Sequence, residues 1–271
     1  MARSKDNSSI LLIGAGRMGS ALIRGWLEGG LGPVVAVEPN PSAALRRLKG
    51  LSFVSGIDQI PRRRWRACVV ALKPQILKTE AARLAPIAAS DTLMISIAAG
   101  TSVKFLAKQW GKQVRIIRAM PNTPGSIGRG ISALYSAPKA TAKNKKLADA
   151  LLAALGQTLW VKSEMLIDAV TAVSGSGPAY VFALTEALAV AGQAAGLPRS
   201  TAEHLARATV CGAGALLDAD SRPPGDLRRD VTSPGGTTEA ALKILLADNG
   251  LQALMTRAVA AAKKRAEELR A

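Results

Sequence analysis

Metal-binding and disulfide-forming side chains are scarce in this chain. Its 271 residues include two cysteines, Cys68 and Cys211, and one histidine, His204. The two cysteines are far apart in apolar surroundings, and no CxxC spacing occurs. A zinc or iron–sulfur site needs several such ligands at short spacing. We therefore expect no metal site and no disulfide, and two free thiols in a reducing cytoplasm.

Long uninterrupted apolar runs are also absent. The polar residues 1–9 lead into only four apolar residues before Gly14, too few for a signal peptide. The most apolar long stretch, residues 169–184, is broken by Gly175, Gly177 and Pro178, which argues against a membrane span. We expect a cytoplasmic protein without a membrane partner. Because 48% of its residues are hydrophobic, a substantial core is expected and disorder is not.

Acidic residues are few in the first part of the chain. Residues 1–163 contain 25 Lys and Arg but 7 Asp and Glu, whereas residues 164–271 contain 11 and 12. The excess positive charge indicates either attraction of anions, such as a phosphorylated cofactor or nucleic acid, or a solvated basic surface. The densest cluster, residues 62–66, has one aromatic side chain and is expected to be a loop. We favour the solvated surface, expect no nucleic-acid partner and assign residues 62–66 no function.

The first part alternates between short apolar, mostly β-branched runs and helical stretches. This alternation predicts a Rossmann-type, doubly wound and mainly parallel sheet in a domain covering residues 1–163. Helices are expected at residues 18–28 and 102–110, and two edge strands, at Gly130–Ser136 and 158–162, around a helix at 143–155. The other expected strands are Ile10–Ile13, Val34–Val37, Leu51–Val54, 67–72, 93–98 and 114–120.

Residues 164–271 are expected to form an all-α domain, because they contain helices rich in alanine and leucine and no convincing strand. Within it, residues 178–192 carry only Thr185 and Glu186 as strongly polar side chains. A helix that is apolar on every side must be covered on every side. The surrounding hundred residues are few for that task, so we expect an obligate dimer through this domain.

A dinucleotide fingerprint of the form GxGxxG follows the first strand and opens a helix. In this strand–turn–helix setting the pyrophosphate of a cofactor is expected over the helix N-terminus. A tight turn that packs a helix on a strand is the simpler alternative. The expected cofactor-binding residues are Gly14, Ala15, Gly16, Arg17, Met18 and Gly19.

Glu38 closes the second strand, where an acidic side chain normally accepts hydrogen bonds from the adenosine ribose. A carboxylate there repels a 2′-phosphate, which favours NAD. Arg46 and Arg47 follow on the next helix and would suit NADP. The cofactor is therefore expected to be NAD or NADP, with the preference open.

Three further motifs end predicted strands. In an open parallel sheet the ligand lies across the carboxyl ends of the strands, so these positions should border the same dinucleotide. Each alone could be an ordinary turn. They are Leu72, Lys73 and Pro74, then Ala98 and Ala99, and finally Met120, Pro121 and Asn122.

Two loops of glycines and hydroxyls in the second part precede helices, at residues 173–180 and 231–238. Such loops offer backbone N–H donors to a small anion such as a carboxylate. Residues 164–197 contain no Lys, Arg or His, although a dehydrogenase acting on an alcohol normally keeps such a group beside its substrate. An imine can be protonated from water near neutral pH, so its reduction needs hydride and orientation more than a strong acid. The pattern favours reduction of a C=N bond.

These motifs resemble those of the pyrroline-5-carboxylate reductases, and the resemblance covers nearly the whole chain. The pattern joins the fingerprint 14–21, the strand ends 72–74 and 120–124, and the segment 164–171. Its most specific parts are the two loops, Ser-Gly-Ser-Gly-Pro-Ala-Tyr at 174–180 and Asp-Val-Thr-Ser-Pro-Gly-Gly-Thr-Thr at 230–238. Glu38 departs from the small or polar residue of many relatives, and this puts the common NADPH preference in doubt.

The resemblance implies reduction of 1-pyrroline-5-carboxylate to L-proline by NAD(P)H, in homo-oligomers built from interlocked dimers and often from rings of dimers. By motif position, Thr238 would be catalytic, with its hydroxyl on the ring nitrogen. The other implied substrate-binding residues are Glu164, Ser174, Gly175, Ser176, Gly177, Ser233, Gly235, Gly236 and Thr237.

Two alternatives stay open at this point. A 3-hydroxyacid dehydrogenase of similar two-domain build, or another imine reductase, would share the fingerprint; the dehydrogenase would need a base that residues 164–197 do not supply. A nucleic-acid-binding protein using the basic first domain is the more remote alternative.

Overall fold

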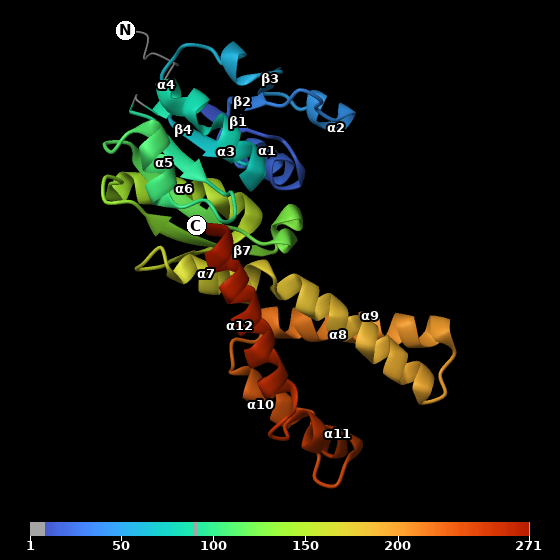
Figure 1. Ribbon diagram of the computed structural model, residues 1–271. Helices are drawn as coiled ribbons and strands as arrows, with labels where there is room; N and C mark the ends of the chain where they lie inside the picture. The colour runs from blue at the N-terminus through green and yellow to red at the C-terminus, as the bar shows by residue number, and fades with distance from the viewer. Residues whose placement is uncertain (1–8, 89–90, 271) are drawn as a thin grey trace. The chain divides into compact units, whose positions relative to one another are not determined.

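The computed structural model describes residues 9–88 and 91–270 of the chain. Residues 1–8, whose polar character argued against a signal peptide, lie outside the described residues. The described part contains one eight-stranded sheet in the order β3-β2-β1-β4-β5-β6-β7-β8 (Figure 1). The strands are β1 (Ile10–Ile13), β2 (Val34–Val37), β3 (Leu51–Val54), β4 (Ala67–Val70), β5 (Leu93–Ser96), β6 (Arg115–Met120), β7 (Gly130–Ser136) and β8 (Gly156–Trp160).

Neighbouring strands run parallel, except that β6 and β7 are antiparallel. This arrangement confirms the predicted doubly wound, mainly parallel sheet. The prediction of two edge strands is wrong for β7, which lies between β6 and β8. The turn η4 (Thr123–Ile127) reverses the chain after β6 and places β7 beside it, so β8 alone occupies this edge.

Alternate side chains of the central strands enter two separate cores. In β1, Ile10 and Leu12 face one core while Leu11 and Ile13 face the other, and all four are buried. Because both faces of these strands are buried, their sequences are continuous apolar runs. The first face is covered by α1 (Arg17–Glu28), α2 (Ala43–Arg46) and α6 (Ala142–Leu152), and the second by α3 (Pro74–Glu80), η3 (Ala81–Leu84), α4 (Ala85–Ala88) and α5 (Val103–Trp110).

Helix α1 is fixed against α6 and the turn η5 (Ala153–Leu155) that follows it. The indole N–H of the buried Trp26 donates to the carbonyl oxygen of Leu151 at 2.6 Å. A Cβ on Gly25 would lie 2.6 Å from the Cβ of Ala154, so only glycine permits this approach. Helix α1, which begins within the fingerprint, is thereby fixed to the segment between β7 and β8.

Several predicted elements end earlier than expected, for local reasons. Strand β4 ends at Val70 because Leu72 and Lys73 lead into α3, whose first residue is Pro74. The helix expected at 143–155 divides into α6 and the 3-10 turn η5. The cluster 62–66 is a loop before β4, as predicted, and the short turn η2 (Ile57–Gln59) precedes it.

After β8 the described chain is helical, which agrees with the predicted all-α region. Figure 1 shows these helices in yellow to red. They are α7 (Leu166–Val170), the π-helical turn η6 (Thr171–Gly175), α8 (Gly177–Ala194), α9 (Arg199–Ala219), α10 (Pro224–Asp230), α11 (Thr237–Leu245) and α12 (Leu251–Arg270).

The chain forms two compact units. One contains the sheet up to Gly175 together with the end of α12 from Ala262, and the other contains residues 176–261. The domain boundary expected after residue 163 stays a prediction. In the second unit α8 and α9 pack closely, since a Cβ on Gly192 would lie 3.2 Å from the Cβ of Ala202.

Helix α8 leaves much of its apolar surface uncovered in the single chain. Only Ala189 is buried, whereas Phe182 and Val190 are each 64% exposed. Apolar surface of this kind marks an interaction site. The single chain does not bury the apolar side chains of α8. This agrees with the expectation that another surface covers the helix.

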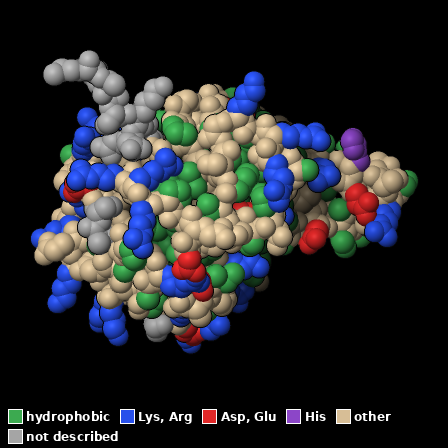
Figure 2. All heavy atoms as spheres, turned by 90° about the horizontal axis from the view of Figure 1, so that it is seen from above, with side chains coloured by type: hydrophobic (Ala, Val, Ile, Leu, Met, Phe, Trp, Pro, Cys, Tyr) green, Lys and Arg blue, Asp and Glu red, His purple; other side chains and the backbone are tan. Residues whose placement is uncertain are grey.

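Positive charge predominates on one face of the molecule (Figure 2). In Figure 2, Lys and Arg side chains outnumber Asp and Glu side chains on the face that is shown. No helix among the described residues is both long enough and apolar enough to cross a membrane.

Candidate active site

The glycine-rich loop between β1 and α1 leaves room for a phosphate group. Gly14 has a φ of +92°, a conformation that favours glycine. A Cβ on Gly19 would lie 2.1 Å from the carbonyl oxygen of Gly14, so this glycine lets α1 pack on the loop. A Cβ on Gly16, in contrast, would meet nothing within 4 Å. The open space at Gly16 and the N–H groups of the first turn of α1 fit the pyrophosphate of a dinucleotide.

Glu38 is fixed beside this loop. One carboxylate oxygen accepts the backbone N–H of Ala15 at 3.0 Å, and the other accepts the N–H of Asn40 at 3.1 Å. The acid that follows β2 is therefore held at the fingerprint before any ribose is bound. Arg46 is exposed and donates from Nε to the carbonyl oxygen of Pro41 at 3.1 Å.

The ends of β4 and β5 contribute the next expected positions. A Cβ on Gly14 would lie 3.2 Å from Cδ2 of Leu72, so the end of β4 borders the fingerprint. Lys73 is exposed and precedes Pro74 at the start of α3. Ala98 is buried after β5, with its N–H 3.4 Å from Oγ of Ser96. The adjacent Ala99 leads into Gly100, which has a φ of +64°.

The end of β6 is joined to the first hydroxyl loop. The side-chain amide of Asn122 donates to Oγ of Ser174 at 3.2 Å, and its carbonyl oxygen accepts the N–H of Ile131 at 2.9 Å. A Cβ on Gly175 would lie 2.7 Å from Cε of Met120, so glycine allows this side chain to reach the loop. One predicted cofactor-binding motif and one predicted substrate-binding loop are thus in direct contact.

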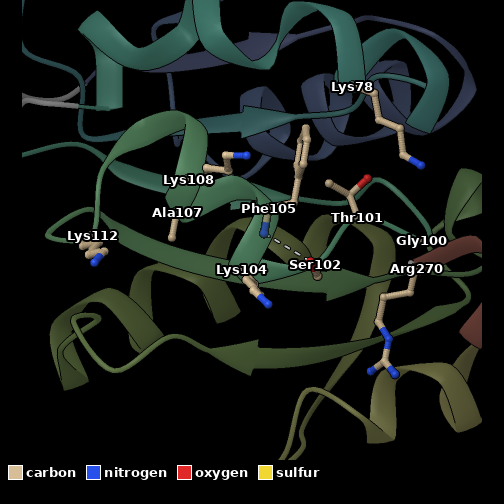
Figure 3. A pocket seen from close by; sticks show the side chains of 10 residues that line it. All are labelled: Lys78, Gly100, Thr101, Ser102, Lys104, Phe105, Ala107, Lys108, Lys112 and Arg270. Carbon is tan, nitrogen blue, oxygen red and sulfur yellow. Dashed lines mark hydrogen bonds between the residues drawn. The ribbon is translucent and has the colours of Figure 1, made fainter.

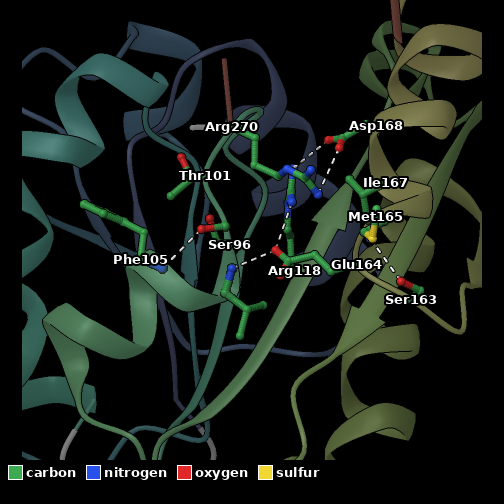
Figure 4. A network of polar contacts seen from close by, with 12 residues as sticks. Ser96, Thr101, Phe105, Arg118, Ser163, Glu164, Met165, Ile167, Asp168 and Arg270 are labelled. Atoms are coloured by element: carbon green, nitrogen blue, oxygen red, sulfur yellow. Dashed lines mark hydrogen bonds and ion pairs between the residues drawn. The ribbon is translucent and has the colours of Figure 1, made fainter. Parts of the chain in front are cut away.

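Glu164 takes part in a charged network that the sequence motifs did not indicate (Figure 4). Its Oε1 accepts from Nη1 of Arg118 at 2.9 Å and from the backbone N–H of Val103, the first residue of α5, at 2.7 Å. Arg118 also faces Asp168, with 4.0 Å between Nη2 and Oδ1. Nη1 of Arg270 in turn lies 3.1 Å from Oδ2 of Asp168.

This network is deeply buried at its centre. The side chains of Arg118 and Asp168 are 1% and 2% exposed, while those of Glu164 and Arg270 are 20% and 26% exposed. Two cations and two anions alternate, so the group is neutral as a whole. A buried charge is tolerated when it is paired, and Asp168 lies between two cations although its Oδ2 accepts no hydrogen bond from the described residues. The network connects β6, the start of α5, the turn before α7, α7 itself and the end of α12.

The second hydroxyl loop leads into α11. Gly235 has a φ of +70°, and its N–H donates to Oε2 of Glu239 at 2.8 Å. Gly236 precedes the helix, and its N–H donates to the carbonyl oxygen of Ser233 at 3.0 Å. Thr237 and Thr238 are the first two residues of α11, where backbone N–H groups are available to an anion. Thr238 is half-buried, and its hydroxyl has no hydrogen-bond partner among the described residues.

The structure therefore assembles the expected residues in two groups. In the first unit it brings together the fingerprint, Glu38, the ends of β4, β5 and β6, Glu164, Ser174 and Gly175. In the second unit it brings Ser233, Gly235, Gly236, Thr237 and Thr238 together at the start of α11, while Ser176 and Gly177 open α8.

Sequence motifs missed Arg118, Asp168 and Arg270. One signal was present, because Arg118 interrupts the buried strand Arg115–Met120, and a charge in such a strand needs a partner. The identity of its partners could not be read from the sequence, since they lie 46 and 50 positions along the chain. Among the described residues there is no group of three or more His, Cys, Asp or Glu side chains that could hold a metal ion.

Two family models match the chain. The model for the dimerisation region of pyrroline-5-carboxylate reductase matches residues 164–269, and one for an NADP oxidoreductase that is coenzyme F420-dependent matches residues 9–100. Pyrroline-5-carboxylate reductase of Pseudomonas aeruginosa is 40% identical over 265 residues, 96% of each chain. The same enzyme of Pisum sativum is 38% identical over 269 residues, 97% of each chain.

The chain belongs to the pyrroline-5-carboxylate reductase family. Solved structures agree with this assignment. A pyrroline-5-carboxylate reductase from Coxiella burnetii is 35% identical with a TM-score of 0.89, and the match covers 98% of this chain and 100% of that one. A pyrroline carboxylate reductase from Plasmodium falciparum with NADP bound is 28% identical, with a TM-score of 0.81 and coverage of 98% and 99%. The resemblance predicted from the motifs is confirmed.

Proposed function

We propose that this family member reduces 1-pyrroline-5-carboxylate to L-proline, the last step of proline biosynthesis, with NADH or NADPH. The reduced nicotinamide supplies a hydride to the imine carbon when it is bound. The imine nitrogen takes up one proton from water, so the C=N bond becomes CH–NH. An imine that is protonated before or during hydride transfer needs no strongly basic or acidic side chain.

The observation that carries this proposal is the hydrogen bond between Asn122 and Ser174, 3.2 Å long. It joins the carboxyl end of β6, where the fold places a dinucleotide, to the first hydroxyl loop. In this proposal the hydroxyl loop lies beside the cofactor groove.

We assign the binding of the substrate carboxylate to the two hydroxyl loops. Backbone N–H groups at the starts of α8 and α11 are suited to an anion without a cationic side chain. The assigned residues of the first loop are Ser174, Gly175, Ser176 and Gly177, and those of the second are Ser233, Gly235, Gly236 and Thr237. Thr238 forms a hydrogen bond with the ring nitrogen through its hydroxyl, and its lack of a protein partner among the described residues supports this role.

Glu164 lies at the edge of the substrate in this proposal. A free carboxylate there would repel the carboxylate of the substrate. Arg118 reduces this repulsion, because its guanidinium lies 2.9 Å from Oε1 and its positive charge neutralises the Glu164 carboxylate. Both hydrogen bonds of Glu164 use Oε1, so Oε2 stays available to accept a hydrogen bond.

The test is a set of initial rates with NADH and NADPH against 1-pyrroline-5-carboxylate and its six-membered homologue. We expect oxidation of the cofactor and formation of L-proline in equal amounts. A protein that failed to reduce either imine, and instead oxidised 3-hydroxy acids with NAD(P), would contradict the proposal.

We also propose a homodimer formed through the helices of residues 164–271, with further assembly into a ring of dimers. The dimerisation model that matches residues 164–269 supports the dimer and a domain boundary near residue 163, and the exposed side chains of Phe182 and Val190 also support the dimer. Sedimentation should show a dimer or a multiple of it at nanomolar concentration. A folded monomer under these conditions would overturn this part. The cytoplasmic location and the lack of a nucleic-acid partner stay predictions.

A further inference from the structure

A cavity of about 640 Å³ lies along α5 on the face of the sheet that α3 covers (Figure 3). It is lined by the loop that precedes α5, by one face of α5, by Lys78 of α3 and by Arg270 at the end of α12. Neither the fingerprint, Glu38 nor any other expected cofactor-binding residue lines it. We call this space the α5 cavity.

The α5 cavity is surrounded by positive charge. Five of its ten lining residues are cationic and none is acidic. Among the described residues, none of the four lysines has an ion-pair partner. Like charges that line one cavity repel one another, and an anion bound among them relieves this repulsion. The cationic lining residues are Lys78, Lys104, Lys108, Lys112 and Arg270.

The interior of the cavity is mainly apolar. Phe105 and Ala107 line it, and Figure 3 shows the ring of Phe105 between the side chains of Lys78 and Lys108 in this view. Cavities of roughly 300–1,000 Å³ suit small organic ligands. A bare inorganic anion would leave the aromatic ring and much of this volume unused.

Arg270 connects the cavity to Glu164. It lines the cavity, and its Nη1 also lies 3.1 Å from Oδ2 of Asp168. Asp168 shares Arg118 with Glu164. An anion that draws Arg270 into the cavity leaves Asp168 with Arg118 as its cation. Arg118 then neutralises Glu164 less completely, and the affinity for an anionic substrate falls.

We propose that the α5 cavity is an inhibitory site for a small organic anion that has an aromatic or apolar body and at least two acidic groups. Recognition is by the lysines and Arg270, and inhibition passes through Asp168 and Arg118 to Glu164. The inhibitory part rests on the proposed function, since it places Glu164 beside the substrate; the binding part does not.

Binding is tested by calorimetric titration of the purified enzyme with benzene-1,3,5-tricarboxylate, and in parallel with 1-naphthyl phosphate to distinguish carboxylate from phosphate recognition. We expect the double variant Lys104→Gln/Lys108→Gln to bind the better of the two about tenfold more weakly. The matched control Lys143→Gln/Lys146→Gln removes the same charges from α6, at another cation-lined cavity. Failure of both probes to bind, or an equal loss in both variants, would overturn the site.

Coupling is tested by initial rates at saturating cofactor. The probe should raise KM for pyrroline-5-carboxylate about fivefold in the wild type and leave kcat unchanged. In Asp168→Asn, calorimetry should still detect the probe, while the rise in KM should disappear. Binding without any change in KM would overturn the inhibitory role. If the enzyme binds the probe in calorimetry but reduces no imine, the proposed function is refuted. The proposed binding site is then still supported.

Discussion

The carboxylate of Glu38 accepts a hydrogen bond from the backbone N–H of Ala15, with 3.0 Å between oxygen and nitrogen. This bond holds a negative charge at the glycine-rich loop, on the side where β2 ends. The adenosine ribose of a dinucleotide lies at this position in a doubly wound fold. A 2′-phosphate would meet that charge directly.

Replacing Glu38 by serine should therefore shift the cofactor preference. Because the carboxylate repels the 2′-phosphate and accepts ribose hydroxyls, the wild type should prefer NADH. In Glu38→Ser the ratio of kcat/KM for NADPH to that for NADH should rise about tenfold. Glu28→Ser, an exposed acid at the other end of α1, is the control and should leave the ratio unchanged. An unaltered ratio in Glu38→Ser would refute this role.

Gly16 and Gly19 should respond differently to alanine. A Cβ on Gly16 meets open space, so Gly16→Ala should leave the free energy of unfolding nearly unchanged while raising KM for the cofactor. A Cβ on Gly19 would lie 2.1 Å from the carbonyl oxygen of Gly14, and Gly19→Ala should destabilise the fold by about 2 kcal/mol. Denaturant unfolding and cofactor titration measure the two effects. Normal cofactor binding by both variants would contradict a phosphate site at Gly16.

Arg118→Met should be strongly destabilising. The variant leaves Asp168, which is 2% exposed, and Glu164 without their shared cation. Removing one partner of a buried ion pair costs about 3–5 kcal/mol. In the double variant Arg118→Met/Glu164→Gln one orphaned charge is removed, so part of the free energy of unfolding should return. If Glu164→Gln changes the free energy of unfolding by the same amount in the wild type and in Arg118→Met, Arg118 and Glu164 are not coupled.

Thr238→Val should lower kcat about 100-fold with little effect on stability, because valine keeps the shape and removes the hydroxyl assigned to the ring nitrogen. Thr238→Ser retains the hydroxyl and should recover most of the rate. Steady-state kinetics with pyrroline-5-carboxylate and circular dichroism of both variants are the measurements. A normal rate in the valine variant would remove Thr238 from the mechanism.

The two thiols should differ in reactivity. Burial raises the pKa of the Cys68 thiol, whereas Cys211 is exposed in the single chain. The folded enzyme should therefore release at most one equivalent of thionitrobenzoate from Ellman's reagent, even at pH 9, where an ordinary exposed thiol is largely ionised. Unfolding in guanidinium should release two equivalents. Two reactive thiols in the folded enzyme would show that the core around β4 opens readily.

Local patterns were sufficient for most elements of the sheet. Strands β1, β2 and β3 match their predicted ranges because each is a short apolar run bounded by turn residues. Strand ends were less predictable, as at Val70, where a following proline starts a helix. The position of β7 was mispredicted because strand order depends on how the turn at Thr123–Ile127 reverses the chain.

The candidate site was predictable where one motif contains the whole feature. The roles predicted for Gly14, Gly16 and Gly19 follow from their spacing and stay predictions, although the open space at Gly16 is compatible with a phosphate. The charged network was not predictable in this way. Residues 164–197 contain no cation, yet Arg118 reaches Glu164 and Arg270 reaches Asp168 from distant parts of the chain.

The sequence by itself determined the alternation of strands and helices, the dinucleotide fingerprint, the two hydroxyl loops and the family. These features depend on neighbouring residues, whose spacing is visible along the chain. The tertiary structure alone decided which carboxylate meets Ala15, which cation neutralises Glu164 and which side chains line the α5 cavity. Long-range pairs of this kind arise from the packing of separate elements, and no local pattern specifies them.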